Sequence, residues 1–258
     1  MAAYVSDQGL RARWASGEVL LGGWLTIPDA FSAEIVARAG FDWVCIDMQH
    51  GLADHRDAAA MIHAITYAGT IPIVRVPSLD DGAIGRALDT GARGVIVPMV
   101  NTRAAAEAAV AACRYAPVGR RSFGPTKARY SLGANYFDWA NDDVLCIVMV
   151  ETGEALGNLD AIAGTRGVDA IFVGPSDLGV SLGLGPGLDN AAATFTGAID
   201  AILSACRHHR VAPAIYADAS MAPTRLQQGF RMVAVANDSV LLSGAASSAL
   251  TAVRETAS

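Results

Sequence analysis

Lysine is almost absent from this sequence of 258 residues. The 19 basic residues comprise 18 arginines and a single lysine, Lys127. An enzyme that works through a Schiff base needs a lysine amine to attack the substrate carbonyl, normally from a strand of its core. Lys127 lies in a long mixed segment and not in an apolar, strand-like run. The composition therefore argues against Schiff-base chemistry.

Cysteine pairs, export signals and long apolar runs are also missing. The first 18 residues lack the apolar core of a signal peptide, and no run approaches the roughly 20 apolar residues of a membrane span. The net charge of −6, with scattered acids, argues against a nucleic-acid partner, which needs a basic face. We therefore expect a cytoplasmic protein with no membrane or nucleic-acid partner. Buried thiols, and not disulfides or a zinc cluster, are expected at the four separated cysteines, Cys45, Cys113, Cys146 and Cys206.

Eight short apolar runs, rich in β-branched residues, alternate with Ala-rich segments of helical pattern. The runs are residues 19–27, 42–47, 71–76, 93–100, 144–151, 169–174, 211–217 and 231–237. Strands that are apolar on both faces are typical of parallel sheets with helices packed outside. Eight such units predict an α/β fold, a single (β/α)8 TIM barrel over residues 1–258, with 1–18 as an N-terminal extension. A doubly wound open sheet is the alternative, but the repeat is regular and no G-x-G-x-x-G follows the first run.

Two segments depart from this rhythm. Residues 115–143 are too long and too mixed for a plain connection, and loops of that length are usually functional. Residues 239–254 have the pattern of an apolar helix, which either closes the barrel of its own chain or packs elsewhere.

Charged residues follow the ends of several runs, where barrel enzymes place their chemistry. Asp47 ends the second run, with His50 just beyond it, and Arg75 lies near the end of the third. Glu151 ends the fifth run, and Asp177 follows the sixth. Side chains alternate faces along a strand, so these charges converge on the barrel mouth if theirs is the inner face. The opposite ends of the runs show no comparable set.

Glu151 and Asp177 are the candidate metal ligands. They lie one strand–helix repeat apart, so we expect them on neighbouring strands, about 5 Å from each other. Two carboxylates so close repel unless one takes up a proton or a cation lies between them. A hard divalent ion with two protein oxygens and open positions fits the pair. In the structural alternative, Glu151 pairs with an arginine and Asp177 caps a helix.

His50, Asp47 and Arg75 are the candidate catalytic residues. A carboxylate that accepts a hydrogen bond from one ring nitrogen leaves the other nitrogen of His50 as a base, although many histidines of this kind are surface-loop residues. Arg75 ends an apolar strand and needs an anionic partner. That partner is either a substrate carboxylate or enolate oxygen, or a strand-end acid, and the two roles are compatible.

Six segments together resemble a known family. In chain order they are "FDWVCIDMQHG", "IPIVRVP", "VIVPMV", "RYAPVGRRSFG", "VMVET" and "IFVGPSDLGVSLG". They resemble the HpcH/HpaI aldolase family of metal-dependent pyruvate aldolases, which includes the 4-hydroxy-2-oxoheptanedioate and 2-dehydro-3-deoxyglucarate aldolases. The resemblance covers roughly residues 20–240, and its motifs are specific as an ordered set. It implies a TIM barrel, as does the strand count.

The resemblance also implies roles for the mouth residues. Glu151 and Asp177 would hold a divalent metal ion, Mg²⁺, Mn²⁺ or Co²⁺. His50 would be the base, Asp47 the acid that orients it, and Arg75 the arginine that stabilises an enolate. The implied reaction is the reversible cleavage of a 4-hydroxy-2-oxo acid into an aldehyde and pyruvate, or a related 2-oxo acid such as hydroxypyruvate.

Substrate contacts and assembly follow from the same resemblance. Trp24 matches a tryptophan of the family, and backbone N–H groups near Ser176 and Asp177 would hold the substrate carboxylate. Arg129, in the 115–143 segment, is a candidate for a distal carboxylate. In this family the C-terminal helix commonly packs on a neighbouring subunit within a hexamer, so a homo-oligomer is expected.

Two segments depart from the family pattern, and two alternative functions stay open. Met48-Gln49 and Met149 replace polar residues that many family members carry near the site, which leaves the substrate open. A CoA-thioester lyase of the citrate lyase β or malyl-CoA lyase type would need a basic adenine-binding surface, and only residues 115–129 are basic. A barrel that binds a 2-oxo acid without turning it over would have no need of a base such as His50.

Overall fold

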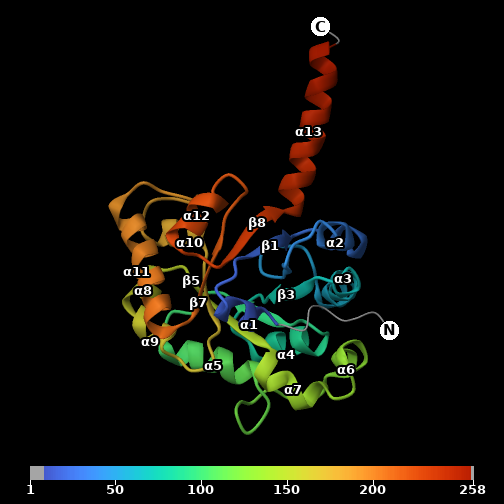
Figure 1. Cartoon of the computed structure of the whole chain (residues 1–258), viewed down its shortest axis with the longest axis vertical. Helices are drawn as coiled ribbons and strands as arrows, with labels where there is room; N and C mark the ends of the chain where they lie inside the picture. Colours follow the sequence, from blue (N-terminus) through green and yellow to red (C-terminus); the bar gives the residue numbers. More distant parts are fainter. Residues whose placement is uncertain (1–8, 257–258) are drawn as a thin grey trace.

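The computed structural model describes residues 9–256 and contains one closed barrel of eight parallel strands in sequential order (Figure 1). The strands are β1 (Leu20–Leu25), β2 (Trp43–Asp47), β3 (Ile71–Arg75), β4 (Gly94–Val97), β5 (Leu145–Val150), β6 (Ala170–Val173), β7 (Ala212–Tyr216) and β8 (Met232–Asn237). Pairing of β1 with β8 closes the ring. The prediction of a TIM barrel is confirmed, and the open-sheet alternative is wrong.

Helices surround the barrel. They are α1 (Leu10–Ala15), α2 (Ala30–Ala37), α3 (His55–Tyr67), α4 (Asp81–Asp89), α5 (Arg103–Cys113), α6 (Thr126–Leu132), α7 (Tyr136–Asp143), α8 (Gly153–Gly157), α9 (Leu159–Ala163), α10 (Pro175–Ser181), α11 (Ala193–His209), α12 (Ala222–Gln228) and α13 (Asp238–Thr256). Asp or Thr caps start several of them; Asp54, for example, forms a reciprocal capping box at α3. No helix in the described chain is long and apolar enough to cross a membrane.

Alternation along the strands separates two buried clusters. Ile73, Ile147 and Met149 belong to the cluster that fills the barrel, whereas Val74 and Val148 pack outward against the helices. Glu151 has the same parity as Ile147 and Met149, so the expected inward aim of this face is confirmed. All four cysteines are buried free thiols, as predicted.

The N-terminal end of the barrel is closed by part of the predicted extension. Helix α1 buries Leu10 against the inner cluster. Arg11 donates to Asp169, just before β6, at 2.8 Å, and Asp169 also accepts from the backbone N–H of Cys146 at 2.8 Å. Contrary to expectation, the N-terminal end of the barrel therefore does carry charged residues, and they pair with each other.

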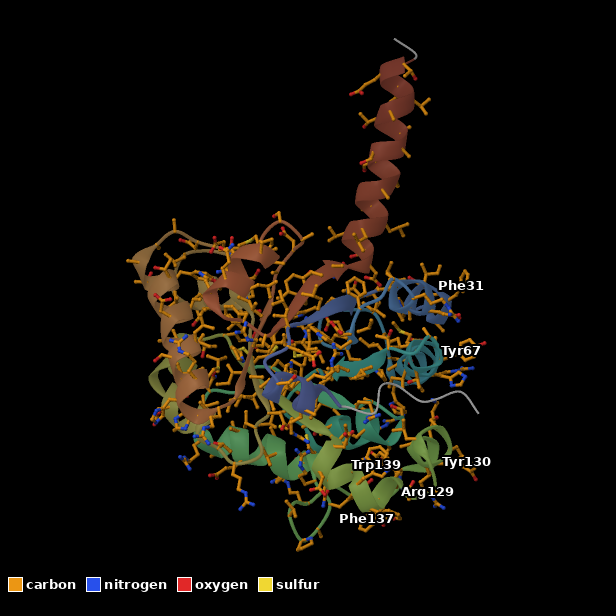
Figure 2. The ribbon with its side chains drawn as sticks, in the orientation of Figure 1. Phe31, Tyr67, Arg129, Tyr130, Phe137 and Trp139 are labelled. Atoms are coloured by element: carbon orange, nitrogen blue, oxygen red, sulfur yellow. The ribbon has the colours of Figure 1, made fainter. Side chains whose placement is uncertain are left out.

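Residues 115–143 form two helices, α6 and α7, and not an extended loop. This segment leads from α5 into the start of β5, so it lies at the N-terminal end of the barrel. Side chains tie it there: Arg121 pairs with Asp89 at 2.6 Å, and Lys127 donates to the carbonyl of Thr90 at 3.5 Å. Figure 2 shows Arg129 and Tyr130 on this side, far from the start of α13.

Helix α13 projects away from the barrel and does not cover its own chain (Figure 1). Only its first residue, Asp238, is buried, where it accepts from the backbone N–H groups of Thr26 and Ile27. The apolar residues Val240, Leu242 and Val253 are exposed. Of the two expectations for this segment, closure of its own barrel is therefore wrong.

Candidate active site at the barrel mouth

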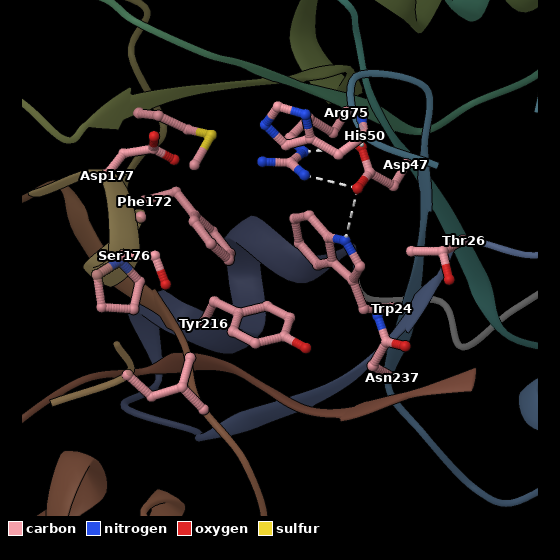
Figure 3. A pocket seen from close by; sticks show the side chains of 14 residues that line it. Trp24, Thr26, Asp47, His50, Arg75, Phe172, Ser176, Asp177, Tyr216 and Asn237 are labelled. Atoms are coloured by element: carbon pink, nitrogen blue, oxygen red, sulfur yellow. Dashed lines mark hydrogen bonds and ion pairs between the residues drawn. The ribbon is translucent and has the colours of Figure 1, made fainter. Parts of the chain in front are cut away.

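A cavity of about 270 Å³ opens at the C-terminal ends of the strands (Figure 3). It brings together most of the predicted site residues, although they come from elements far apart in sequence. Its lining comprises Trp24, Thr26, Asp47, His50, Arg75, Met149, Phe172, Gly174, Pro175, Ser176, Asp177, Leu188, Tyr216 and Asn237. The strands β1, β2, β3, β5, β6, β7 and β8 all contribute side chains to the mouth.

Asp47 and Arg75 form a buried two-point ion pair beneath this cavity. The Arg75 Nε donates to Asp47 Oδ1 at 2.9 Å, and Nη2 donates to Oδ2 at 2.6 Å. The strands set this geometry, because Asp47 and Arg75 are register partners in the β2–β3 pairing. Burial acts to raise the pKa of Asp47, but the hydrogen bonds and charge of Arg75 outweigh it and lower that pKa. Asp47 is therefore held as a carboxylate.

Arg75 has one nitrogen left for another partner. Its guanidinium lies over the Trp24 ring, 4.9 Å from the ring centroid, and Trp24 Nε1 donates to Asp47 Oδ2 at 3.2 Å. Arg75 is only 8% exposed, yet its Nη1 makes no hydrogen bond within the described chain. Arg75 thus already has the predicted strand-end acid as partner and keeps a donor for an anion.

His50 is exposed at the rim of the cavity. Its contact with Asp47 differs from the expected one, because the backbone N–H of His50, and not the ring, donates to Asp47 Oδ1 at 3.2 Å. Gln49 N–H donates to the same oxygen at 3.0 Å. Asp47 therefore fixes the turn that carries His50, and its oxygens are already used by other donors.

Glu151 has a buried carboxylate oxygen without a donor. Oε1 accepts from the backbone N–H of Met99 at 2.8 Å, whereas Oε2 has no hydrogen-bond partner within the described chain. Glu151 is 1% exposed, and burial raises its pKa to about 7; Met99 opposes this rise, and the charge of Asp177 adds to it. The structural alternative fails for Glu151, because no arginine pairs with it among the described residues.

Gly174 allows the free oxygen of Glu151 to pack closely against the backbone. A Cβ at this position would lie 2.3 Å from Oε2, so any larger residue would displace the carboxylate. Glu151 is buried and does not itself line the cavity, whereas Gly174 does. Asp177 lies three residues further on, exposed in the first turn of α10, and no side chain caps that helix. The structural alternative therefore also fails for Asp177, which is free to act as a ligand.

The two carboxylates suit a hard divalent cation. A buried oxygen without a donor normally finds a hydrogen bond or an ion. Neighbouring strands β5 and β6, paired through Val150 and Val173, bring Glu151 and Asp177 into electrostatic contact. The donor set is all oxygen and leaves most coordination positions open, which is what Mg²⁺ or Mn²⁺ requires.

The start of α10 offers backbone donors at the same wall. Pro175 occupies the first position of the helix and has no N–H, and the N–H groups of Ser176 and Asp177 have no acceptor within the helix. The Ser176 hydroxyl donates to the carbonyl of Gly187 at 3.3 Å, which links this turn to the loop that supplies Leu188.

Trp24 was predicted as a site residue, but its aromatic partners Phe172 and Tyr216 were not. The ring centroid of Trp24 lies 5.5 Å from that of Phe172 and 5.4 Å from that of Tyr216, the latter edge-on. Burial raises the pKa of Tyr216, while a hydrogen bond with Asn237 opposes the rise. The position of Tyr216 at the end of a predicted strand was a usable signal. Leu188 lies in a connecting segment, and nothing in the sequence marks it.

Arg129 is not brought to this cavity within the chain. It lies exposed on α6, in the segment between α5 and β5, which is at the opposite end of the barrel. The expectation placed the 115–143 segment near the substrate, but a connection that leads into a strand start lies on the other face.

Comparisons with known proteins show the family of the chain. The family model of the HpcH/HpaI aldolase/citrate lyase family matches residues 21–245. A hydroxypyruvate/pyruvate aldolase of Rhizorhabdus wittichii is 39% identical over 92% of this chain and 95% of its own. A 4-hydroxy-2-oxovalerate aldolase of Rhodococcus jostii is 41% identical over 88% of this chain and 89% of its own.

A solved structure supports the same assignment. The crystal structure of an HpcH/HpaI aldolase/citrate lyase family protein from Burkholderia cenocepacia superposes with a TM-score of 0.89 and 36% identity, covering 95% of this chain and 98% of that one. Because the family model spans most of the barrel and the sequence relatives cover nearly the whole chain, this protein belongs to the HpcH/HpaI aldolase/citrate lyase family.

Proposed function

We propose that this chain is a divalent-metal-dependent aldolase that reversibly cleaves a 4-hydroxy-2-oxo acid into an aldehyde and pyruvate or hydroxypyruvate. The observation that carries the proposal is the buried Oε2 of Glu151, which has no donor in the described chain, packs against Gly174 and feels the charge of a second carboxylate, Asp177. The relatives compared above are named as aldolases of hydroxypyruvate, pyruvate and 4-hydroxy-2-oxovalerate, which supports this substrate class.

Glu151 and Asp177 would hold the ion, with Mg²⁺, Mn²⁺ and Co²⁺ as the candidates. Such an ion supplies Lewis-acid polarisation of the keto oxygen of a bound 2-oxo acid. Glu151 must lose its proton to bind a cation, and its raised pKa of about 7 makes binding dependent on pH. The donors on Ser176 and Asp177 N–H would orient the substrate carboxylate.

Arg75 would stabilise negative charge as it develops on the enolate. The free Nη1 supplies the donor, and the two-point pair with Asp47 holds the guanidinium in place before the substrate arrives. Trp24 supports the same group from its face. Asp47 is therefore a positioning residue for both Arg75 and the turn of His50.

His50 would act as the base. It takes the proton of the 4-hydroxyl, directly or through one water, while the C3–C4 bond breaks and its electron pair passes to the enolate. Protonation of the enolate at C3 then completes the 2-oxo acid. The exposed ring at the cavity rim is the support for this role, because a base must reach a substrate that enters from solvent.

The C-terminal helix supports a homo-oligomer, with a hexamer as the state suggested by family resemblance. Helix α13 exposes Val240, Leu242 and Val253 and projects from the barrel, which suits packing on another subunit. In such an assembly, Arg129 would contact a substrate only across a subunit boundary, since it lies away from the mouth of its own chain.

Turnover with defined substrates tests the function. The purified protein is incubated with hydroxypyruvate or pyruvate and a panel of aldehydes in Mg²⁺, Mn²⁺ or Co²⁺, and aldol products are measured by chromatography and mass spectrometry. We expect carbon–carbon bond formation with at least one aldehyde, and oxaloacetate decarboxylation as a side reaction. EDTA should stop both, and added metal should restore them.

The alternatives give different results in the same experiment. Turnover that persists in EDTA would remove the metal from the proposal. Saturable pyruvate binding without product would indicate a binding barrel. Cleavage of malyl-CoA, with no reaction of 4-hydroxy-2-oxo acids, would support the CoA-thioester lyase.

A further inference from the structure

Two histidines and one aspartate meet on the outer surface of the barrel, far from the mouth. They are Asp160 of α9 and His208 and His209, the last two residues of α11. One ligating atom from each lies within 4.8 Å of the others. His209 Nε2 lies 2.6 Å from Asp160 Oδ1, and the two imidazole rings meet edge-on with centroids 4.7 Å apart. None of the residues proposed for the aldol reaction takes part in this cluster.

The backbone places this cluster with some precision. Helix α9 leads into the start of β6 and α11 leads into the start of β7, so the cluster lies at the N-terminal end of the barrel. The His209 ring rests against the end of α9, where a Cβ at Gly164 would lie 3.0 Å from its Cε1. His209 is thereby half-buried and restrained, whereas Asp160 and His208 remain exposed and accessible to an ion.

The donor chemistry selects a class of ion. Imidazole nitrogens suit Zn²⁺, Ni²⁺ and Cu²⁺, whereas Mg²⁺ prefers oxygen ligands. At metal–ligand distances of about 2.1 Å, ligands on one ion lie roughly 3.4 Å apart. To bind an ion, the exposed His208 side chain would turn inward, and the ion would replace the hydrogen bond between His209 and Asp160, whose atoms are now 2.6 Å apart. The C-terminal end of the 17-residue α11 also favours a cation, because its last carbonyls carry partial negative charge.

Basic residues nearby set the balance of charge. Both histidines and Arg103 lower the pKa of Asp160, chiefly through the hydrogen bond from His209. Arg207 and Arg210 flank the two histidines in the sequence. They line a separate cavity with Arg11 and Trp14. Asp160 is the one carboxylate of the cluster, and Arg103 is an arginine whose charge acts on its pKa.

We propose that Asp160, His208 and His209 form a second metal site, specific for Zn²⁺, Ni²⁺ or Cu²⁺, that joins α9 to α11. These helices stand before and after β6, the strand that leads to Asp177. An ion bound there fastens the two helices to each other and stabilises this part of the barrel. The site has no open contact with the mouth and takes no part in the aldol step.

Zinc binding tests the proposal in a chain that cannot bind metal at the mouth. The full-length protein with Glu151→Gln and Asp177→Asn, freed of any polyhistidine tag, is titrated with ZnCl₂ by calorimetry and dialysed for metal analysis. We expect one equivalent of zinc per chain and a higher melting temperature. His208→Ala or Asp160→Asn in this background should weaken binding at least tenfold, while His63→Ala, an exposed histidine of α3, should leave it unchanged.

Two further measurements keep the proposal testable if the mouth variant does not fold. In the otherwise unchanged chain, we expect two equivalents of zinc, and one after His208→Ala with His209→Ala. Electron paramagnetic resonance with Cu²⁺ should show coupling to two imidazole nitrogens, and to one after His208→Ala. Absence of the additional equivalent, or its persistence without both histidines, overturns the proposal and leaves His209 and Asp160 as an ordinary hydrogen-bonded pair.

Discussion

The two ends of the barrel treat buried acids in opposite ways. At the closed end, Asp169 precedes β6 and has both oxygens engaged, by Arg11 at 2.8 Å, Arg114 at 3.5 Å and the N–H of Cys146 at 2.8 Å. At the mouth, Glu151 follows the neighbouring strand β5 and has one oxygen without any donor in the described chain. Both acids are largely shielded from solvent, so burial alone does not distinguish them.

The two acids differ in their partners within the chain. Around the closed end, Arg93 before β4 pairs with Asp143 of α7, and Arg121 before α6 pairs with Asp89 of α4. The acids there have basic partners, although some buried donors at this end, such as Arg121 Nε, lack an acceptor in the described chain. At the mouth it is an acid, Glu151, that lacks a partner for one oxygen, and a buried carboxylate oxygen of this kind suits a cation.

Removal of the Glu151 carboxylate should reduce metal binding and kcat/KM more than any other change below. Glu151→Gln takes away the negative charge that a divalent cation needs, so we expect loss of metal binding and at least about a 10³-fold fall in kcat/KM. Glu154→Gln makes the same chemical change three residues away, on the exposed surface of α8, and should leave both unchanged. Metal analysis measures metal binding, and aldol cleavage rates give kcat/KM, in both variants. Normal metal content in Glu151→Gln would show that the free oxygen has another purpose.

Replacement of the proposed base should have the next largest effect. His50→Asn removes the proton acceptor but no metal ligand, so we expect kcat to fall about 10²- to 10⁴-fold with metal affinity retained. The exposed histidine His63 lies outside the cavity, and His63→Asn serves as the control. An unchanged cleavage rate in His50→Asn would assign the base to another group at the mouth.

The raised pKa of Glu151 should make the metal-free protein less stable as pH increases. Folding raises this pKa from 4.5 to about 7, so the folded chain binds the proton more tightly than the unfolded chain. Proton binding by Glu151 stabilises the folded state fully below about pH 4.5, and this stabilisation is lost by about pH 7. The free energy of unfolding should fall by on the order of 3 kcal/mol over this range. Urea unfolding in EDTA at several pH values measures it.

The Glu151→Gln variant isolates that contribution, because it cannot lose a proton at this position. Its unfolding free energy should lack this part of the decrease between pH 4.5 and 7, while all other titrating groups remain. Identical pH profiles for the two proteins would contradict the buried, unpaired state of Glu151.

Replacement of Lys127, at the closed end, should change kcat/KM the least. Lys127 is half-buried beside Thr90, on the far side from the mouth, so Lys127→Arg should leave kcat/KM unchanged. Borohydride added with pyruvate should neither inactivate the protein nor add mass, because no lysine amine reaches the substrate. A trapped adduct on Lys127 would overturn the comparison of the two ends.

Much of the mouth could be read from single residues at strand ends. Asp47, Arg75 and Glu151 all lie at or just after the ends of strands, and parity put them on one face of their strands. Which face lies inside the barrel came only from the structure. The local contacts could not be read in this way. Asp47 bonds the backbone and not the ring of His50, since that choice depends on the path of the turn after β2.

The 115–143 segment shows where the prediction was wrong for a general reason. Its length and basic residues suggested a loop near the substrate, yet it forms α6 and α7 at the closed end. In a barrel of this kind, the segment after a strand lies at the mouth and the segment before the next strand lies at the base. Arg129 belongs to the second kind, and its position follows from the chain order once α5 is placed.

The sequence alone favoured the barrel, because eight apolar runs at regular spacing suit a parallel sheet covered by helices. An open sheet would bury both strand faces as well, and the pairing of β1 with β8 settles the choice. The sequence also determined the absence of lysine from the core. Only the tertiary structure decided which charges neutralise each other and which stay free, because that depends on distances of a few ångströms between residues far apart in the chain. Glu151 can place its free oxygen where it does because Gly174, just after β6, has no side chain to displace it.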